Sequence, residues 1–119
     1  MSTAIAKAHA ALRKNALTYP GAVEEFPWGE CVIKVRGRIF VFLGKGEGLS
    51  MSVKLPQSAD VALAIEGSAP TPYGLGQHGW VSLKFAKGSR PPVPLLRAFI
   101  DESYRAVAPK RLVATLTSA

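Results

Sequence analysis

The sequence has little of what disulfide-bonded, metal-binding or membrane-spanning proteins need. Cys31 is its one cysteine, so the chain forms no intrachain disulfide and no cysteine-based metal cluster. Apolar runs stay well short of the ~20 residues that a membrane-spanning helix requires. These features predict a cytoplasmic protein with no membrane partner and no cofactor.

Acidic side chains are also scarce. Eight Asp and Glu face 15 Lys and Arg, which gives a net charge of +7, and 48% of the 119 residues are apolar. This composition is typical of a folded chain, and the length predicts a single domain spanning residues 1–119. The basic excess lies in residues 31–54 and 80–119, without the uninterrupted basic block of a disordered arm. Any basic surface must therefore be assembled by the fold, and an anionic partner is favoured.

The pattern of apolar residues predicts the elements. Helical spacing covers residues 3–17, and two β-rich runs at 31–36 and 39–43 flank Gly37-Arg38, which we interpret as a two-residue type II′ hairpin turn. Period-two alternation predicts further strands. The remaining predictions are strands at 49–55 and 80–85, a short edge strand near Tyr73, and helices at 59–65 (capped by Ser58), after Pro94 and at 110–117. This order indicates an α+β fold, a two-layer α/β sandwich whose antiparallel sheet carries helices on one face.

Residues with catalytic potential are few and poorly arranged. Cys31, His78 and Asp101 supply the residue types of a thiol triad, but Cys31 opens a strand and has no nucleophile elbow around it. A half-buried structural cysteine is the better interpretation. His9 lies on the apolar stripe of the first helix, and the two histidines lack the spacing of metal ligands. We expect no catalytic residue and no metal ligand, and therefore a protein that is not an enzyme.

The outer face of the sheet is the more specific feature. With a turn at Gly37-Arg38, Arg36 opposes Ile39 and Val35 opposes Phe40, so Ile33, Val35, Phe40 and Phe42 share the core face and Lys34 and Arg36 point outward. The same alternation in the later strands places Lys54 and Lys84 on the outer face. The predicted anion-binding residues are Lys34, Arg36, Arg38, Lys54, Lys84, Lys87 and Arg90. Such an array binds phosphates without reading sequence. The alternative is that lysine simply fills the polar outer face that any half-covered sheet needs.

A second unusual stretch runs from Tyr73 to Trp80. It holds two aromatic residues, three glycines, an amide and an imidazole within eight positions. A tryptophan here either stacks on a ligand or anchors the core. The alternative function is therefore a small-ligand or protein-interaction module, whose candidate residues are Trp28, Tyr73, Gln77, His78 and Trp80.

Taken together, seven short motifs form a recognisable series. They are Pro20-Gly21, Phe26-Pro-Trp-Gly29, Lys34-Val-Arg-Gly-Arg-Ile-Phe40, Ser52-Val-Lys54, Tyr73-Gly-Leu-Gly76, Gly79-Trp-Val81 and Asp101-Glu-Ser-Tyr104. In this order and spacing the chain resembles the MmcQ/YjbR family of small bacterial proteins over nearly its whole length. The resemblance implies a CyaY-like fold of two α/β layers and DNA binding, and it carries over no catalytic residue. It also implies a lost cation at Gln77, where the family often has Lys or Arg. The prediction is a non-enzymatic module that binds DNA or another polyanion through the sheet face.

Overall fold

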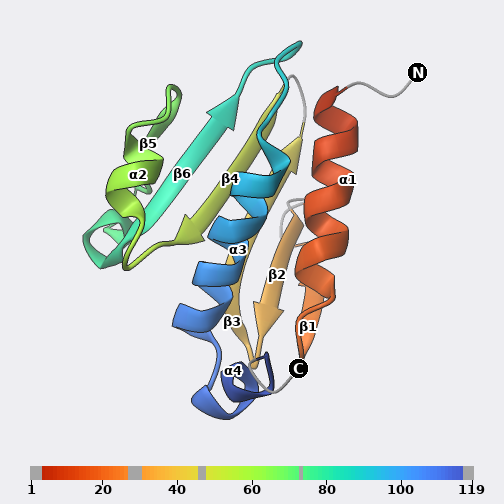
Figure 1. The fold of residues 1–119 in the computed structure, drawn as a ribbon, viewed down its shortest axis with the longest axis vertical. Coiled ribbons are helices and arrows are strands. Elements are labelled where there is room, and N and C mark those ends of the chain that lie inside the picture. The colour runs from red at the N-terminus through yellow and green to blue at the C-terminus, as the bar shows by residue number, and fades with distance from the viewer. Residues whose placement is uncertain (1–3, 27–30, 46–47, 73, 117–119) are drawn as a thin grey trace.

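In the computed structural model, which describes residues 4–26, 31–45, 48–72 and 74–116, helices cover one face of an antiparallel sheet (Figure 1). The described strands form a six-stranded sheet in the order β1-β2-β3-β4-β6-β5. The predicted α+β class is confirmed. The elements are α1 (Ala4–Leu17), β1 (Ala22–Glu25), β2 (Cys31–Val35), β3 (Arg38–Lys45), β4 (Leu49–Lys54), α2 (Ala59–Leu63), β5 (Ser68–Pro70), the 3₁₀ helix η2 (Leu75–His78), β6 (Trp80–Phe85), α3 (Val93–Val107) and α4 (Lys110–Leu116).

The core lies between the sheet and the two long helices. Both α1 and α3 contact β3 and β4, and they also contact each other. Along β4 the burial alternates, so that Leu49, Met51 and Val53 point to the helices while the intervening side chains point away. His9 is buried on the apolar stripe of α1, as predicted, together with Ile5, Ala8, Leu12 and Ala16.

An aromatic cluster joins both ends of the chain to the middle of the sheet. The Tyr104 ring stacks on Tyr19 at 4.7 Å between ring centroids and meets Phe40 edge-on at 5.1 Å. The Tyr104 hydroxyl donates to the Pro20 carbonyl at 2.6 Å, and the Tyr19 hydroxyl donates to Asp101 at 2.8 Å. These polar ends are hydrogen-bonded, so the cluster buries large rings without leaving a hydroxyl unpaired.

The β2–β3 hairpin differs from the prediction by one residue. Val35 opposes Arg38, so the turn residues are Arg36 and Gly37. Their φ angles of 52° and 79° are both positive, as in a type I′ turn. The predicted type II′ turn at Gly37-Arg38 is therefore wrong. A type I′ turn matches the right-handed twist of the strands, and Gly37 supplies the second positive φ without strain.

A bulge in β3 follows the turn. Lys34 opposes Ile39 and Ile33 opposes Val41, which leaves Phe40 as an extra residue between them. Phe40 is fully buried under the helices, whereas Phe42 opposes Val32 and contacts the Trp80 ring. Phe42 thus lies on the outer face, and its predicted place in the core is wrong because the bulge changes the alternation.

Smaller differences between the prediction and the structure concern the edge strands of the sheet and the N-terminal cap of α2. The short strand β1 was not predicted, and the second edge strand, β5, precedes the predicted position near Tyr73. Ser58 makes no side-chain cap at the start of α2. Instead, the Glu102 carboxylate accepts the backbone N–H groups of Gln57 and Ser58, each at 2.9 Å. Among the described residues, no helix is both long enough and apolar enough to cross a membrane.

Candidate functional site

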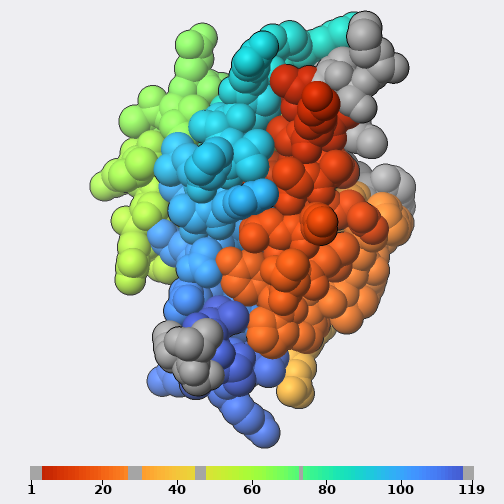
Figure 2. All heavy atoms as spheres, turned by 45° about the vertical axis from the view of Figure 1, so that its right-hand side comes forward, coloured from red at the N-terminus to blue at the C-terminus, as the bar shows by residue number. Residues whose placement is uncertain are grey.

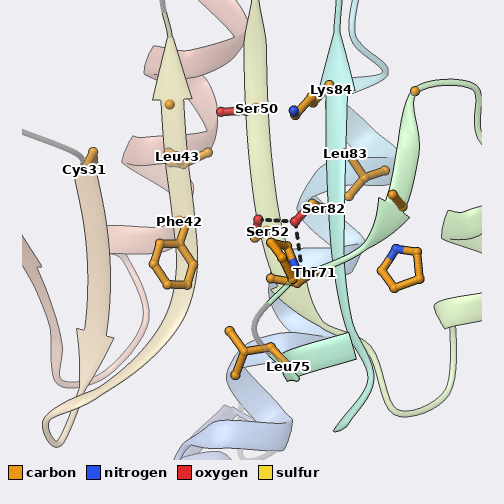
Figure 3. Close-up of a pocket in the computed structure, with 15 residues that line it drawn as sticks. Cys31, Phe42, Leu43, Ser50, Ser52, Thr71, Leu75, Ser82, Leu83 and Lys84 are labelled. Atoms are coloured by element: carbon orange, nitrogen blue, oxygen red, sulfur yellow. Dashed lines mark hydrogen bonds between the residues drawn. The ribbon is translucent and has the colours of Figure 1, made fainter. Parts of the chain in front are cut away.

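The sheet face turned away from the helices carries the candidate residues. In Figure 3 this outer face is toward the viewer and the helices lie behind the strands. The side chains on this outer face include small hydroxyl groups, two aromatic rings and three lysines. By register, the outward positions of the central strands are Val32, Lys34, Phe42, Gly44, Ser50, Ser52, Lys54, Trp80, Ser82 and Lys84.

The structure confirms the outward direction of three predicted lysines but not that of Arg36. Lys34, Lys54 and Lys84 lie on the outer face, and the Lys34 ammonium pairs with Glu25 at 3.0 Å. Arg36 lies in the turn, and Arg38 opposes the buried Val35, so it belongs to the other side of the sheet. The expected convergence of Arg36 with the outward lysines is wrong because the turn begins one residue earlier than predicted.

The register also divides the predicted cations between two ends of the sheet. Lys54 pairs with Trp80 and Lys84 pairs with Ser50, which separates the two lysines by four residues along β6. At a rise of about 3.3 Å per residue this is about 13 Å. Lys87 and Arg90 are exposed in the segment that follows β6, beyond Lys84. One end therefore carries Lys34, Arg36, Arg38 and Lys54, and the other carries Lys84, Lys87 and Arg90.

Helix α4 adds two cations to the hairpin end. A methyl group on Gly21 would lie 3.5 Å from both Leu112 Cδ1 and Val35 Cγ2, so α4 and the end of β2 approach the same point. Both segments project at one end of the molecule (Figure 2), where Lys110 and Arg111 are exposed. We call Arg36, Arg38, Lys110 and Arg111 the hairpin-end cluster. The adjacent basic pair is visible in the sequence, but its position beside the hairpin depends on the fold.

Nearby acids are engaged elsewhere. Asp101 pairs with Arg105 at 2.7 Å, Glu102 accepts the two N–H groups before α2, and Glu24 binds Arg13 through two hydrogen bonds. Within the described ranges, no residue of the hairpin-end cluster has a carboxylate at ion-pair distance. Its positive charge is therefore not cancelled locally.

A hollow of about 500 Å³ opens on the other part of the outer face. Its floor comes from β3, β4 and β6, and the segment from β5 to η2 forms a wall (Figure 3). This wall includes Leu75 from the predicted loop, while Gln77 and His78 are exposed. Trp80 is buried beside the hollow with its ring 5.9 Å from that of Phe42. Trp28 and Tyr73 lie outside the described residues.

The residues of the conceivable thiol triad do not meet. Cys31 lies on β2, whereas His78 is in η2, which packs on β5 and β6 beyond two intervening strands. Three strand spacings amount to about 14 Å. Asp101 instead binds Tyr19 and Arg105. Nor do the described residues include three or more His, Cys, Asp or Glu placed to hold a metal ion.

The environment of Cys31 also disfavours nucleophilic chemistry. Its thiol donates to Glu24 Oε2 at 3.2 Å, and burial together with this carboxylate raises its pKa to about 12. The Arg13 guanidinium, hydrogen-bonded to Glu24, holds the pKa of that carboxyl below its usual range. Glu24 thus stays ionised and opposes formation of the thiolate.

Because the pKa of the Cys31 thiol is raised, we predict that Cys31 is alkylated slowly. At pH 8 a free thiol with a pKa near 8.5 is substantially ionised, whereas a thiol with a pKa of about 12 is almost wholly protonated. We expect iodoacetamide to modify the native protein at least about 100-fold more slowly than the unfolded protein, measured by intact mass. A native rate close to the unfolded one would contradict this description of the site.

Comparison with models of known protein families gives a match. The sequence model of the family described as YjbR matches residues 17–106. No curated protein matches the chain. The match spans β1 to α3 and so includes the whole sheet, the hollow and the hairpin, whereas α4 lies beyond it.

Proposed function

The chain belongs to the YjbR family, and from the charge at one end of its fold we propose that it is a non-enzymatic module that binds DNA or another polyanion without reading sequence. The observation that carries this proposal is the hairpin-end cluster. Four exposed cations from two segments far apart in the sequence lie at one end, with no carboxylate paired to them among the described residues. Such an arrangement attracts phosphates through charge and counterion release.

The side chains suit phosphate contacts. Arginine presents a planar fork of donors that matches phosphate oxygens, and lysine acts as a compact point charge. Lys54 and Lys34 lie on the outer face toward the same end, so a bound strand passing the hairpin would meet them next. Lys34 contributes less because Glu25 already pairs with it. Contacts of this kind fix a backbone in place but carry no base information.

The cluster is carried by ordered elements. The hairpin is closed by a two-residue turn, and the Phe40 carbonyl at its bulge accepts a hydrogen bond from the buried Ser103. Helix α4 is held through Leu112, Val113 and Leu116, which pack against the core. The backbone that carries the cations is therefore already ordered before binding, which reduces the entropic cost.

Salt dependence tests the proposal directly. We expect a labelled mixed-sequence duplex to bind at about 50 mM salt, with log K falling against log salt with a slope of about −4 for roughly four phosphate contacts. Fluorescence anisotropy at three or more salt concentrations measures this slope. A slope near zero, or no binding at low salt, would refute polyanion binding.

Paired charge reversals locate the surface. Arg36→Glu with Lys110→Glu should lower the affinity at least about tenfold, because two phosphate contacts are lost and two repulsions are introduced. The matched control is Lys87→Glu with Arg90→Glu, which changes the net charge equally at exposed positions after β6, at the other end of the sheet. Equal losses in the two double variants would show a diffuse charge effect and contradict the proposed surface.

A further inference from the structure

The hollow on the outer face results from small residues in the middle of the sheet. Two rows of paired positions cross it, Gly44–Ser50–Lys84 and Phe42–Ser52–Ser82. Four of the six residues in these rows are glycine or serine, whereas Phe42 and Lys84 at two of the row ends are large. The Ser50 hydroxyl already fills the space over Gly44, where an added methyl group would come within 2.5 Å of it. A floor of small residues inside a rim of large ones leaves the volume of about 500 Å³, within the usual size of a small-molecule site.

The wall beside this floor is firmly held. Thr71 N–H donates to the Trp80 carbonyl at 3.1 Å, and Gly76 N–H donates to the Thr71 carbonyl at 2.9 Å. A methyl group on Gly76 would lie 2.8 Å from Pro70 Cβ, so η2 packs closely against β5. Leu75 and Pro72 therefore give the hollow a fixed apolar lining, and Leu75 lies across it from the ring of Phe42 (Figure 3). The hollow therefore has apolar side chains on two of its sides.

Three hydroxyl groups form a polar line along the floor. The Ser82 hydroxyl is 2.8 Å from that of Ser52 and 2.9 Å from that of Thr71 (Figure 3). Three hydroxyls hold three protons, and two bonds among them use two. Within the described part of the chain no further acceptor is found for the third proton. The line therefore offers a donor to an acceptor atom in the hollow.

Lys84 brings a positive charge to the rim. Its side chain is exposed, and its ammonium lies over the hollow beside Ser50. No carboxylate among the described residues pairs with it. Lys54, the outer-face lysine toward the hairpin, is already about 13 Å from Lys84 along the strand, so this charge is separate from the hairpin-end cluster beyond Lys54.

We propose that this hollow is a binding site for a small aromatic anion, with the ring between Phe42 and Leu75, an acceptor on the hydroxyl line and the carboxylate or phosphate at Lys84. The site lies apart from the surface proposed for polyanions and does not depend on it. Aromatic rings supply the flat apolar area that the hollow offers, and a single lysine at its rim matches one anionic group.

Titration with 2-naphthoate, followed by the amide signals in ¹H–¹⁵N NMR spectra, tests the proposal. We expect a dissociation constant of about 1 mM or tighter for a ligand of this size. The largest shifts should fall on Ser50, Ser52, Ser82 and Lys84, with none at the hairpin-end cluster. The neutral 2-naphthylmethanol should bind at least about fivefold more weakly, because it lacks the charge that Lys84 recognises.

Variants separate this site from a general affinity for aromatic anions. Lys84→Gln should weaken naphthoate about fivefold and leave naphthylmethanol unchanged, whereas the matched outer-face change Lys54→Gln should affect neither. Ser52→Phe should fill the hollow and abolish both. Binding that survives Ser52→Phe in a folded protein, equal loss in the two lysine variants, or no binding up to about 10 mM would each overturn the proposal. The Ser52→Phe protein should bind the duplex with unchanged affinity, because the hollow is separate from the hairpin-end cluster. Failure of one proposal is therefore distinguishable from failure of the other.

Discussion

Phe40→Ala is expected to destabilise the protein by about 4 kcal/mol. Phe40 is fully buried, and its ring contacts both Tyr19 and Tyr104. Removing it costs the transfer free energy of the ring and leaves a cavity under the helices that their packing fills only partly. Urea denaturation followed by circular dichroism measures the change as a lower midpoint at constant slope.

The chain offers a matched control two residues away. Phe42 has the same side chain, but it lies half-buried on the outer face, and among the described residues its ring contacts that of Trp80. We expect Phe42→Ala to cost about 1–2 kcal/mol, because less of its surface leaves water on folding. If the two alanine variants were equally destabilised, the bulge that turns Phe40 to the core and Phe42 outward would be placed wrongly.

Ser103→Ala is expected to cost about 2–3 kcal/mol, although it removes a single oxygen. This fully buried hydroxyl donates to the Phe40 carbonyl at 2.5 Å and accepts the Lys54 N–H at 2.9 Å. The Phe40 carbonyl belongs to the bulge, where the regular ladder is interrupted. Alanine leaves both backbone groups buried without this partner, and each carries a desolvation penalty.

Two measurements distinguish this account from a general loss of packing. Hydrogen exchange should show faster exchange of the Lys54 amide in Ser103→Ala than the global destabilisation predicts, because its acceptor has gone. Ser89→Ala is the control, since the Ser89 hydroxyl bonds a carbonyl in a partly exposed turn and should cost less than about 1 kcal/mol. Unchanged protection of the Lys54 amide would argue against the bridging role of Ser103.

How far the sequence predicts this fold is clearest at the hairpin. The two β-rich runs and the glycine between them predict a tight two-residue turn, and the structure has one. Its register depends on whether Gly37 is the first or the second turn residue, and local preference favours the first because a type I′ turn needs a positive φ at Arg36 too. The bulge at Phe40 depends on contacts with Ser103 and Tyr104, more than 60 residues away in the sequence.

In the candidate sites too, some features follow from a local sequence pattern and others depend on tertiary contacts. Alternation along β4 and β6 is a local property, so it predicts the outward direction of Lys54 and Lys84 correctly. The meeting of α4 with the hairpin at Gly21 is a tertiary contact with no local pattern. The hollow likewise requires the rows of paired positions across three strands, and serines that look like ordinary polar filler in one strand become its floor only when those strands are in register.

The order of elements along the chain has a consequence for synthesis on the ribosome. The meander β1 to β4 pairs neighbouring segments and is complete at Lys54, but α3, which covers β3 and β4, ends about 50 residues later at Val107. At about 5–20 residues per second the apolar face of the nascent sheet waits roughly 3–10 s with only α1 against it. During that interval the buried side chains of β3 and β4 have no α3 to cover them, and docking of Tyr104 and Ser103 ends the exposure.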